Sequence, residues 1–585
     1  MGVASTGLGL PVGRAYAAAG PPMLYVDSIA DLLALDTTQF SSGQHVNVAA
    51  YHTGWTANAK GPVGGGIFVW KTSMAKSLHN GGTVVSNTVP WTWTNVGQSF
   101  LNGVGETNPT GNGVYVRQNV HTSIDVTHFG AKSDGALVET VPFQKAIDFA
   151  ASLTRKMPVY IPAGAYTLGE ITLAPEVSIR GTDKNRTKLI PSMEGMTLFT
   201  LDLGAGGGAN LTLGDFNINC DGKPSVRGIY AKGANCLGIH NVAFYGCQRA
   251  FELDQGGWNR VVNCESAPIG EMVTGDFWVG SSDDNVYGNV YSVIENYQIR
   301  VAANGATSPA GTFRRAVAMK ITNLIACSNQ FAGTGIVIEN DCQGLMFTDC
   351  SVVGFGIAVQ FRKGAGIDKA PVFNTLTNVE FDQNATNAIL MDAGTDNRFT
   401  SCAVTSSFVA TGTQQIVLRS AASSNRFYGC HVAGYYTSPG GTGWLLDGCD
   451  RTVLEGCTVT GSYQGIAASN HPTHCKVIDC DFSDNVTYGV TGDFTNQGNE
   501  IRGCFGIIPD IANAAAPTLP ASGSTVANVW PVPVRVFVTG GTITGLKLAG
   551  TTITHAGPAQ FLLNPGETAG VVYTGSPTWT WVGTR

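Results

Sequence analysis

The chain has 585 residues, a formal net charge of −7 and only 13% charged residues. This length exceeds what one ordinary globular core holds, so the chain must divide into domains or grow by stacking repeats. It contains no block of basic residues and no apolar run as long as a membrane span, so neither nucleic acid nor a membrane is an expected partner. The 75 glycines indicate many tight turns and little helix.

Residues 1–118 are expected to form a separate N-terminal module. The phrases Tyr51 to Trp55 and Gly64 to Trp70 are typical of the strands and turns of a small β-rich unit. Residues 1–22 contain a run of three alanines, Ala17 to Ala19, but no basic segment and no solid apolar segment. A secretory signal is therefore not expected.

One amphipathic helix is expected from near Thr140, which is a plausible N-cap residue. Its apolar stripe at helical spacing consists of Phe143, Ala146, Ile147, Ala150 and Leu153. If stacked strands follow, a lone helix at this place would cover the apolar first coil, which would otherwise be an open end.

A short phrase recurs from Leu237 to Phe505, as in Phe347 to Val352 and Phe399 to Val404. With its central Cys or Val as a marker, the repeat is 22 to 29 residues long, apart from one step of 37. Repeats of this length are typical of solenoids, and apolar–polar alternation is typical of strands. Short strands without intervening helices predict a parallel β-helix with coils about 4.8 Å apart. The markers are residues 220, 242, 264, 290, 327, 350, 379, 402, 430, 457, 480 and 504.

Nine of the fourteen cysteines occupy the marker position. Because buried cysteine behaves as a small apolar residue, we expect a stack of free thiols rather than disulfides. The absence of any CxxC pair is typical of a protein that folds in a reducing cytoplasm. His471 and His474 lie in an expected turn without ligand partners, so we expect no metal and no other cofactor.

The repeat stops after Phe505. Residues 509–530 are rich in Pro, Ala and Ser and are expected to be a linker. Residues 531–585 have the strand and turn pattern of a compact C-terminal β domain. Residues 119–508 would then hold the β-helix with its capping helix.

The segment Asp125 to Gly181 resembles the opening of the pectate-lyase-like superfamily found in bacteriophage tailspikes. The phrases that carry this resemblance are Phe129-Gly130-Ala131, Asp134-Gly135 and Tyr160-Ile161-Pro162-Ala163-Gly164. The phrases within residues 1–118 also resemble N-terminal modules of tailspikes. The resemblance implies an all-β fold: a right-handed parallel β-helix with a short N-terminal capping helix, a small β-rich N-terminal module and a C-terminal β domain.

The same resemblance implies a homotrimeric virion protein that folds in the host cytoplasm. It would attach to the phage baseplate or an adaptor through the N-terminal module. It would bind and depolymerise a bacterial surface polysaccharide, namely capsule, exopolysaccharide or O-antigen. The C-terminal domain would hold the trimer together or bind glycan. Because this fold carries lyases, hydrolases and pure binders, the chemistry needs its own argument.

Candidate site residues come from the irregular region around the 37-residue step, because insertions on a solenoid often build its binding site. The candidate catalytic acids are Asp276, Asp283, Asp284 and Glu295. Aromatic rings can stack on sugars, and arginine can bind acidic sugars through two hydrogen bonds. The candidate substrate-binding residues are Trp258, Trp278, Tyr287, Tyr291, Tyr297 and, in an expected inserted loop, Arg300, Arg314 and Arg315.

A β-helix can place two carboxylates at catalytic spacing. Side chains on one face lie about 4.8 Å apart in adjacent coils and about 9.6 Å apart two coils away. Retaining glycosidases need carboxyl groups roughly 5–5.5 Å apart and inverting ones roughly 6.5–9.5 Å. Hydrolysis by a carboxylate pair is therefore favoured, with Glu252 and Glu265 as further candidate partners.

Two alternatives remain open. A lyase acting on a uronate-containing glycan needs only a base and a group that neutralises the uronate carboxylate, and the region supplies Tyr and Arg. A non-catalytic receptor-binding spike would use the aromatic residues alone. Of the phrases typical of polygalacturonases, only Asp283-Asp284 is present. Asp254, Asp392 and Asp447 stand about ten residues before a marker, a position that favours a turn role.

Overall fold

The computed structural model places the chain in two compact units, Met1–Tyr166 and Thr167–Arg585. It describes residues 22–583 except for 56–62, 95–96, 119, 121, 221, 224, 268–274, 302–308, 365, 367, 407–412, 435–440, 487–493, 495–497, 507–515 and 531–532. Nearly all of residues 1–22, to which the expectation about a secretory signal refers, lies outside the described residues, as does the first part of the expected linker. Among the helices that the structure describes, none is long and apolar enough to cross a bilayer.

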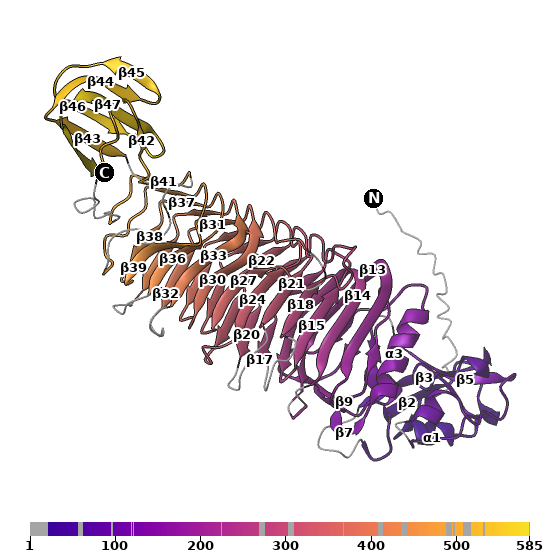
Figure 1. The fold of residues 1–585 in the computed structure, drawn as a ribbon. Helices are drawn as coiled ribbons and strands as arrows, with labels where there is room; N and C mark the ends of the chain where they lie inside the picture. The colour runs from indigo at the N-terminus through magenta and orange to yellow at the C-terminus, as the bar shows by residue number, and fades with distance from the viewer. Residues whose placement is uncertain are drawn as a thin grey trace, which may run out of the picture. The chain divides into compact units, whose positions relative to one another are not determined.

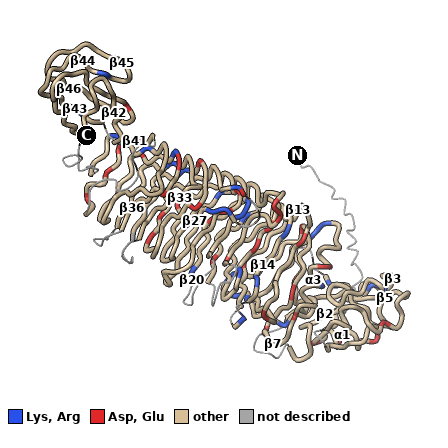
Figure 2. Tube along the Cα trace, in the orientation of Figure 1, with Lys and Arg blue, Asp and Glu red and all other residues tan. Residues whose placement is uncertain are grey.

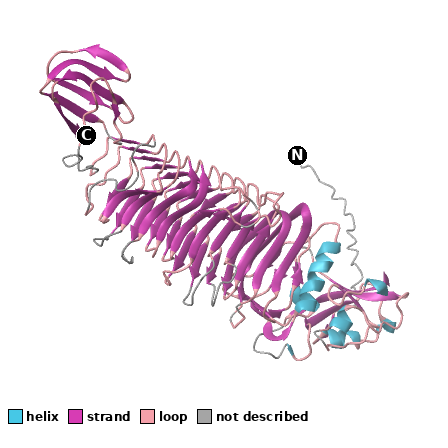
Figure 3. Ribbon diagram, in the orientation of Figure 1, coloured by secondary structure: helices cyan, strands magenta, loops and turns pink. Residues whose placement is uncertain are grey.

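The first unit contains a five-stranded sheet with the order β1-β2-β3-β5-β4. Its strand β3 includes the glycine-rich phrase that the sequence marked as strand. All described helices of the chain belong to this unit (Figure 3). The elements are β1 (Leu24–Val26), α1 (Ile29–Leu33), η1 (Thr37–Gln39), β2 (His45–Ala50), β3 (Gly64–Ala75), η3 (Lys76–Leu78), β4 (Val84–Ser86), α2 (Gln98–Leu101) and β5 (Asn112–Arg117).

The expected amphipathic helix is α3, Thr140–Ser152, and the inner residues of its apolar stripe are buried. It packs against β6 (Ile124–Asp125), η4 (Val126–Phe129) and β8 (Val159–Ile161). The ring of Phe143 meets that of Tyr166 edge-on at 5.1 Å. The prediction of Thr140 as N-cap is wrong, because Glu139 holds that position and makes no side-chain capping bond.

The second unit contains a parallel β-solenoid (Figure 1), and the solenoid has about 16 turns. It begins with short strands and two long ones, and β14 pairs in turn with three strands of the next coil. The predicted fold class is thereby confirmed. These early strands are β10 (Ile171–Thr172), β11 (Ile179–Gly181), β12 (Thr187–Pro191), β13 (Thr197–Asn219) and β14 (Arg227–Tyr245).

Later coils have three faces, each a parallel ladder of short strands. The first face contains β16 (Arg260–Val262), β19 (Val293–Glu295), β22 (Lys320–Thr322), β25 (Met346–Thr348), β28 (Thr375–Thr377), β31 (Arg398–Thr400), β34 (Arg426–Tyr428), β37 (Val453–Glu455), β40 (Lys476–Ile478) and β41 (Glu500–Arg502). The second contains β17 (Glu265–Ala267), β20 (Gln298–Val301), β23 (Ile325–Ser328), β26 (Ser351–Val353), β29 (Glu380–Asp382), β32 (Ala403–Ser406), β35 (His431–Gly434) and β38 (Thr458–Thr460). The third contains β15 (Arg249–Asp254), β18 (Phe277–Gly280), β21 (Gly311–Arg314), β24 (Thr334–Glu339), β27 (Ile357–Arg362), β30 (Asn387–Thr395), β33 (Gln414–Ser423), β36 (Thr442–Asp447) and β39 (Gln464–Ser469).

The repeated phrase is a corner between the first and second faces rather than one continuous strand. The residue before the marker has a positive φ in coil after coil, for example 54° at Asp349 and 51° at Ser401. Asn, Asp, Ser and Gly recur at this position, and all but Ser are the residue types that tolerate the left-handed region best. The marker itself points inward, where Cys350 and Cys402 are 3% and 2% exposed.

All fourteen cysteines are free, as the sequence predicted. Burial raises the pKa of Cys264 and of Cys342 to about 12, so these thiols stay protonated at neutral pH. A second internal ladder consists of buried amides, in which Asn374 donates to Asn397 at 2.9 Å and Asn397 to Asn425 at 3.0 Å. The interior therefore combines apolar packing with paired polar groups.

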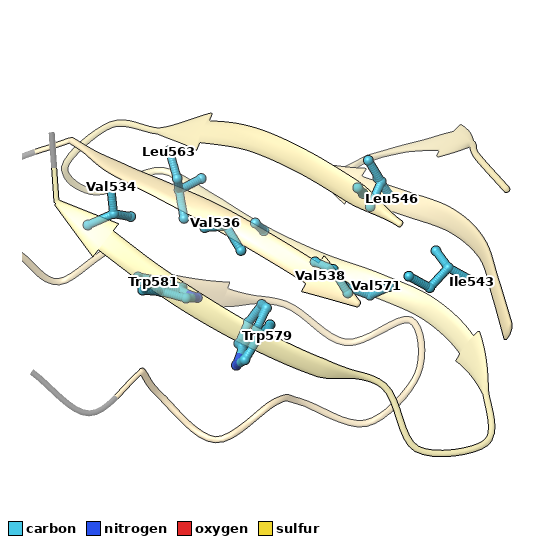
Figure 4. Close-up of a cluster of buried hydrophobic side chains, with 11 residues drawn as sticks. Val534, Val536, Val538, Ile543, Leu546, Leu563, Val571, Trp579 and Trp581 are labelled. Carbon is cyan, nitrogen blue, oxygen red and sulfur yellow. The ribbon is translucent and has the colours of Figure 1, made fainter. Parts of the chain in front are cut away.

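The C-terminal β domain has a three-stranded sheet, β46-β43-β48, and a four-stranded sheet, β42-β47-β44-β45. Its core includes Val536, Val571, Trp579 and Trp581, which point into the space between the strands (Figure 4). The strands are β42 (Val526–Ala527), β43 (Val534–Thr539), β44 (Thr542–Leu548), β45 (Thr551–Thr554), β46 (Ala559–Leu563), β47 (Thr568–Thr574) and β48 (Thr578–Gly583).

Candidate functional site

Two of the predicted site residues lie inside the solenoid. Asp276 and Tyr297 are both 0% exposed. The hydroxyls of Ser266 and Tyr297 donate hydrogen bonds to the two carboxylate oxygens of Asp276. Burial raises the pKa of Asp276 to about 6 against the lowering effect of these bonds and of Arg249. In this position Asp276 joins the second face to the third through the core.

Three predicted residues lie on strands of different faces. Glu295 is on β19 of the first face, with Oε2 4.0 Å from Nη2 of Arg260. Trp278 is half-buried on β18 and pairs across the third face with Glu252. Arg300 was expected in an inserted loop, but it is exposed on strand β20. The 37-residue step is not one enlarged coil, because Val290 lies at the corner before the first face, where it pairs with Gly257, whereas Cys327 lies on β23 of the second face. In the segment after β20, residues 302–308 lie outside the described residues.

The turn between β18 and β19, residues 281–292, carries four predicted residues. Asp283 accepts the backbone N–H of Asn285 at 2.8 Å and so stabilises the turn. Asp284 accepts a 2.5 Å hydrogen bond from Nη2 of Arg314, which stands at the end of β21 rather than in a loop. The side chain of Asp284 remains 39% exposed. Tyr287 and Tyr291 occupy the second half of this turn.

A carboxylate that the sequence did not single out lies beneath this turn. Asp341 follows β24, and its side chain is only 6% exposed. Its Oδ2 accepts the hydroxyl of Tyr287 at 2.8 Å and lies 3.4 Å from Nζ of Lys369. Gln343 donates to Oδ1 of Asp341 at 2.8 Å and to the hydroxyl of Tyr287 at 2.8 Å.

The predicted binding residue Arg315 completes this cluster. Its guanidinium lies 4.5 Å above the ring of Tyr287 and 3.8 Å from Oδ2 of Asp341. Its Nε donates to the carbonyl of Val286 at 3.0 Å. We call Tyr287, Arg315, Asp341, Gln343 and Lys369 the polar cluster. It spans four successive coils and joins turns that are far apart in the sequence.

Charged side chains alternate along the outer edge of the third face next to this cluster. The register pairs Lys232 with Asp254, Arg314 with Glu339, and Glu339 with Arg362. Nε of Arg362 donates to Glu339 at 2.8 Å. Acidic and basic residues are interspersed along the coils throughout the solenoid (Figure 2). Such cross-strand pairs stabilise the stack of coils.

The turn role expected for Asp254, Asp392 and Asp447 is wrong for their own positions. Asp254 and Asp447 are the last residues of strands β15 and β36, and Asp392 lies within β30. From its place at the end of β15, Asp254 stabilises the turn of residues 281–292 in the next coil. Its carboxylate accepts hydrogen bonds from the N–H and the hydroxyl of Ser282 at 2.8 and 2.6 Å.

Two predicted aromatic residues lie together at the corner between the third and first faces. The rings of Trp258 and Tyr291, in adjacent coils, are 6.2 Å apart with an angle of 36° between their planes. Their exposed fractions are 56% and 60%. The structure thus brings together Trp258, Tyr291, Tyr287, Arg315, Asp284 and Arg314 at one corner and its edge. Asp276, Tyr297, Glu295 and Arg300 lie elsewhere in the coils.

This corner offers rings for stacking, fixed hydrogen-bond donors and an accessible carboxylate. Burial raises the pKa of Tyr287, and the hydrogen bond to Asp341 raises it further, so its phenol is protonated at neutral pH. That environment disfavours Tyr287 as the base of an elimination. Within the described parts of the chain, no group of three or more His, Cys, Asp or Glu side chains could hold a metal ion.

Three family models match successive parts of the chain. Residues 25–119 match the phage tail protein small four-stranded β-sheet domain. Residues 123–218 match the pectate-lyase-like rhamnogalacturonase A/epimerase model, and residues 365–508 match the right-handed β-helix region. The chain combines a phage tail β domain with a pectate-lyase-like right-handed β-helix. The resemblance inferred from the sequence is thereby confirmed.

Solved structures share this architecture at low identity. The gp42 tailspike of Acinetobacter phage vb_AbaP_AS12 is 11% identical, with a TM-score of 0.50 over 97% of this chain and 94% of that one. The N-terminal fragment of bacteriophage phi29 gene product 12 is 14% identical, with a TM-score of 0.49 over 74% and 73%. The A-module of the Azotobacter vinelandii mannuronan C-5 epimerase AlgE6 is 14% identical, with a TM-score of 0.47 over 66% and 99%.

At these identities the tailspike likeness is one of fold alone. No curated protein matches the sequence. The function must therefore be argued from the residues of this chain.

Proposed function

We propose that the protein is a phage tailspike that binds and depolymerises a bacterial surface polysaccharide by endo-glycosidic hydrolysis. The observation that carries this proposal is the turn of residues 281–292, which carries the accessible carboxylate of Asp284, Tyr287 of the polar cluster, and Tyr291, whose exposed ring pairs with that of Trp258. Aromatic faces, fixed donors and an accessible acid are what a glycosidase needs in one place. The matched phage tail domain supports a place in the virion.

Asp284 is the best placed of the four candidate acids. Its side chain is accessible, and a 2.5 Å hydrogen bond from Nη2 of Arg314 orients it. In this proposal Asp284 activates water or attacks the anomeric carbon, while a second acid protonates the leaving oxygen. Asp283, which is exposed beside Asp284 in the same turn, is the candidate for that acid. Asp276, which is buried, would act by holding the coils that carry the site.

The remaining parts of the chain have roles in this proposal. Residues 1–118 attach the protein to the phage baseplate or an adaptor. Residues 119–508 form the receptor-binding and catalytic part, and residues 509–530 link it to the C-terminal β domain at 531–585. That domain holds a homotrimer together or binds glycan. Protein that folds in the host cytoplasm would then act at the surface of the next cell.

The deciding experiment is incubation with capsular and O-antigen polysaccharides from a panel of bacteria, followed by mass analysis of the products. Fragments heavier by one water per cleavage are expected. Products without added water that absorb in the ultraviolet would mean elimination on a uronate-containing glycan. Binding without fragments would mean a receptor-binding spike.

Asp284→Asn tests the assigned carboxylate, and Asp183→Asn is its matched control. The two aspartates have side-chain exposures of 39% and 37%, and each lies near an arginine. Asp284→Asn should lower the rate of cleavage at least 100-fold, the size of effect typical for loss of a positioned acid or base. Asp183→Asn should cleave as the wild type does. Equal activity of both variants would remove Asp284 from the mechanism, and Asp283→Asn and Glu295→Gln would then be tested in the same assay.

A further inference from the structure

One corner of the solenoid is built on a repeated left-handed residue. Between the third and first faces, the N–H of this residue donates to the corresponding turn of the next coil, as Trp258 does to the carbonyl of Val290 at 2.8 Å and Tyr291 to that of Val317 at 3.1 Å. This bond defines equivalent positions in successive coils, which we call the corner positions. They are Cys236, Trp258, Tyr291, Ala318, Gly344, Phe373, Asp396, Ser424 and Arg451, with φ between 50° and 64°.

Bulky aromatic residues are poor choices for this backbone. Left-handed φ favours Gly, Asn and Asp, and for a bulky residue it is a conformational outlier. Among the corner positions, Gly344 and Asp396 follow this preference. Trp258, Tyr291 and Phe373 do not, and their exposed fractions of 56%, 60% and 62% show that they gain little core packing in return. Strain held by exposed side chains indicates a role outside the fold.

Between Tyr291 and Phe373, the corner has a short stretch without large side chains. Tyr291 and Phe373 are separated by three coil steps, or roughly 14 Å at the spacing of adjacent strands. The corner positions between them are the small residues Ala318 and Gly344. A Cβ added at Gly344 would meet no atom closer than 3.9 Å, so the space above it is open.

Hydrogen-bonding groups stand beside this interval in the same coils. Tyr287 belongs to the turn that carries Tyr291, and Lys369 to the turn that carries Phe373. Between them, Asp341 and Gln343 are held by the bonds of the polar cluster. An extended ligand along the solenoid axis would meet rings at both ends and fixed polar groups in the middle.

We propose that the corner from Trp258 to Phe373 is the binding track for one polysaccharide chain that lies along the solenoid axis. Pyranose rings with an apolar face stack on the Trp258–Tyr291 pair at one end and on Phe373 at the other. The sugars between them pass over Ala318 and Gly344, and their hydroxyls face the polar cluster. This inference rests on the proposed polysaccharide binding and adds its direction, its extent and the residue Phe373.

A second copy of this chain is the competing occupant, and the chemistry disfavours it. The core of a protein–protein interface is depleted in charged residues. Here the charged Lys369, whose side chain is 64% exposed, stands in the turn that carries Phe373. A chain of sugars presents apolar ring faces for stacking and hydroxyls for hydrogen bonding. A surface on which aromatic side chains alternate with fixed hydrogen-bonding groups suits such a chain.

The backbone supplies a sharp test, because asparagine tolerates the left-handed region better than an aromatic residue does. Trp258→Asn, Tyr291→Asn and Phe373→Asn should leave the melting temperature unchanged or raise it. Each should weaken binding at least about tenfold, as expected when one well-packed aromatic contact is lost. The probe is the panel polysaccharide that the wild type binds, measured by calorimetry. The matched control is Arg451→Asn at an equivalent corner position, which should bind as the wild type does.

Each contrary outcome identifies a different error. Wild-type binding that all three variants retain would overturn the track and leave the proposed function standing. A fall in melting temperature would mean that the rings stabilise the fold and would overturn the strain argument. A change in oligomeric state, measured by light scattering, would make the corner a contact between subunits. Failure of the wild type to bind any polysaccharide in the panel would overturn both the track and the proposed function.

Discussion

The phenol of Tyr287 donates a 2.8 Å hydrogen bond to Oδ2 of Asp341, a residue 54 positions later in the chain. Tyr287 lies in the turn before β19, and Asp341 in the turn after β24. The bond therefore joins turns that are two coils apart. Asp341 also lies 3.8 Å from the buried guanidinium of Arg315. One carboxylate therefore holds both the phenol of Tyr287 and the guanidinium of Arg315 in place.

Loss of either partner should have a different effect on stability. Tyr287→Phe removes the hydroxyl that donates to Asp341 and accepts from Gln343, and should lower the free energy of unfolding by about 1–2 kcal/mol. Asp341→Ala leaves Arg315, whose side chain is 6% exposed, without its carboxylate and should cost about 3–5 kcal/mol. Urea unfolding would measure both. Tyr291→Phe, which alters a ring that is 60% exposed, should change stability by less than about 0.5 kcal/mol. Equal losses for all three variants would contradict the assigned bonds.

The buried carboxyl of Asp276 predicts a pH-dependent stability. Its pKa is raised from 3.8 to about 6 by burial, so the folded protein favours the protonated form. This contribution is fully present below pH 3.8 and is lost as the pH rises through about 6. The shift corresponds to about 3 kcal/mol.

Comparison with Asp276→Asn isolates this group from all others that titrate. The variant stays neutral, so its stability deficit relative to the wild type should be largest near pH 4 and should shrink by about 3 kcal/mol by pH 8. Urea unfolding of both proteins at several pH values measures the difference. A deficit that is constant with pH would mean that Asp276 does not titrate in this range.

The amide ladder inside the solenoid predicts a large effect at its central residue. Asn397 accepts from Asn374 at 2.9 Å and donates to Asn425 at 3.0 Å. Asn397→Ala removes both bonds and leaves buried partners unsatisfied, so it should cost about 2–4 kcal/mol. Asn329→Ala, at an exposed turn, should cost less than about 0.5 kcal/mol. Comparable losses in urea unfolding would mean that the ladder contributes little.

The repeated phrase was enough to predict the solenoid because the same left-handed backbone conformation recurs in coil after coil. Each marker is preceded by a residue such as Asp349 or Ser401, and the inward marker must be small and apolar. Local preferences and the repeat length therefore lead to the same fold. The corner within the phrase was missed, although the recurring Asn, Asp and Gly before the marker signal it.

The candidate site was less predictable because its bonds join distant turns. Nothing near Asn340-Asp341 in the sequence indicates that Asp341 would meet Tyr287, since a turn pair of this kind is common in loops. Asp276 and Tyr297 are residue types that are common in surface sites, but both side chains face inward. A period of two decides which way a residue points, and a single irregular coil removes that information.

The free thiols give the last prediction, because exposure separates one cysteine from the rest. Cys236 is exposed, whereas Cys264 and Cys342 are buried with pKa values raised to about 12. Since the thiolate is the reactive form, a thiol reagent should modify Cys236 first in the folded protein, and Cys236→Ser should remove this fast phase. Denatured protein without reductant should titrate close to the full fourteen thiols. A titre well below that number would mean that disulfides form and would contradict folding in a reducing compartment.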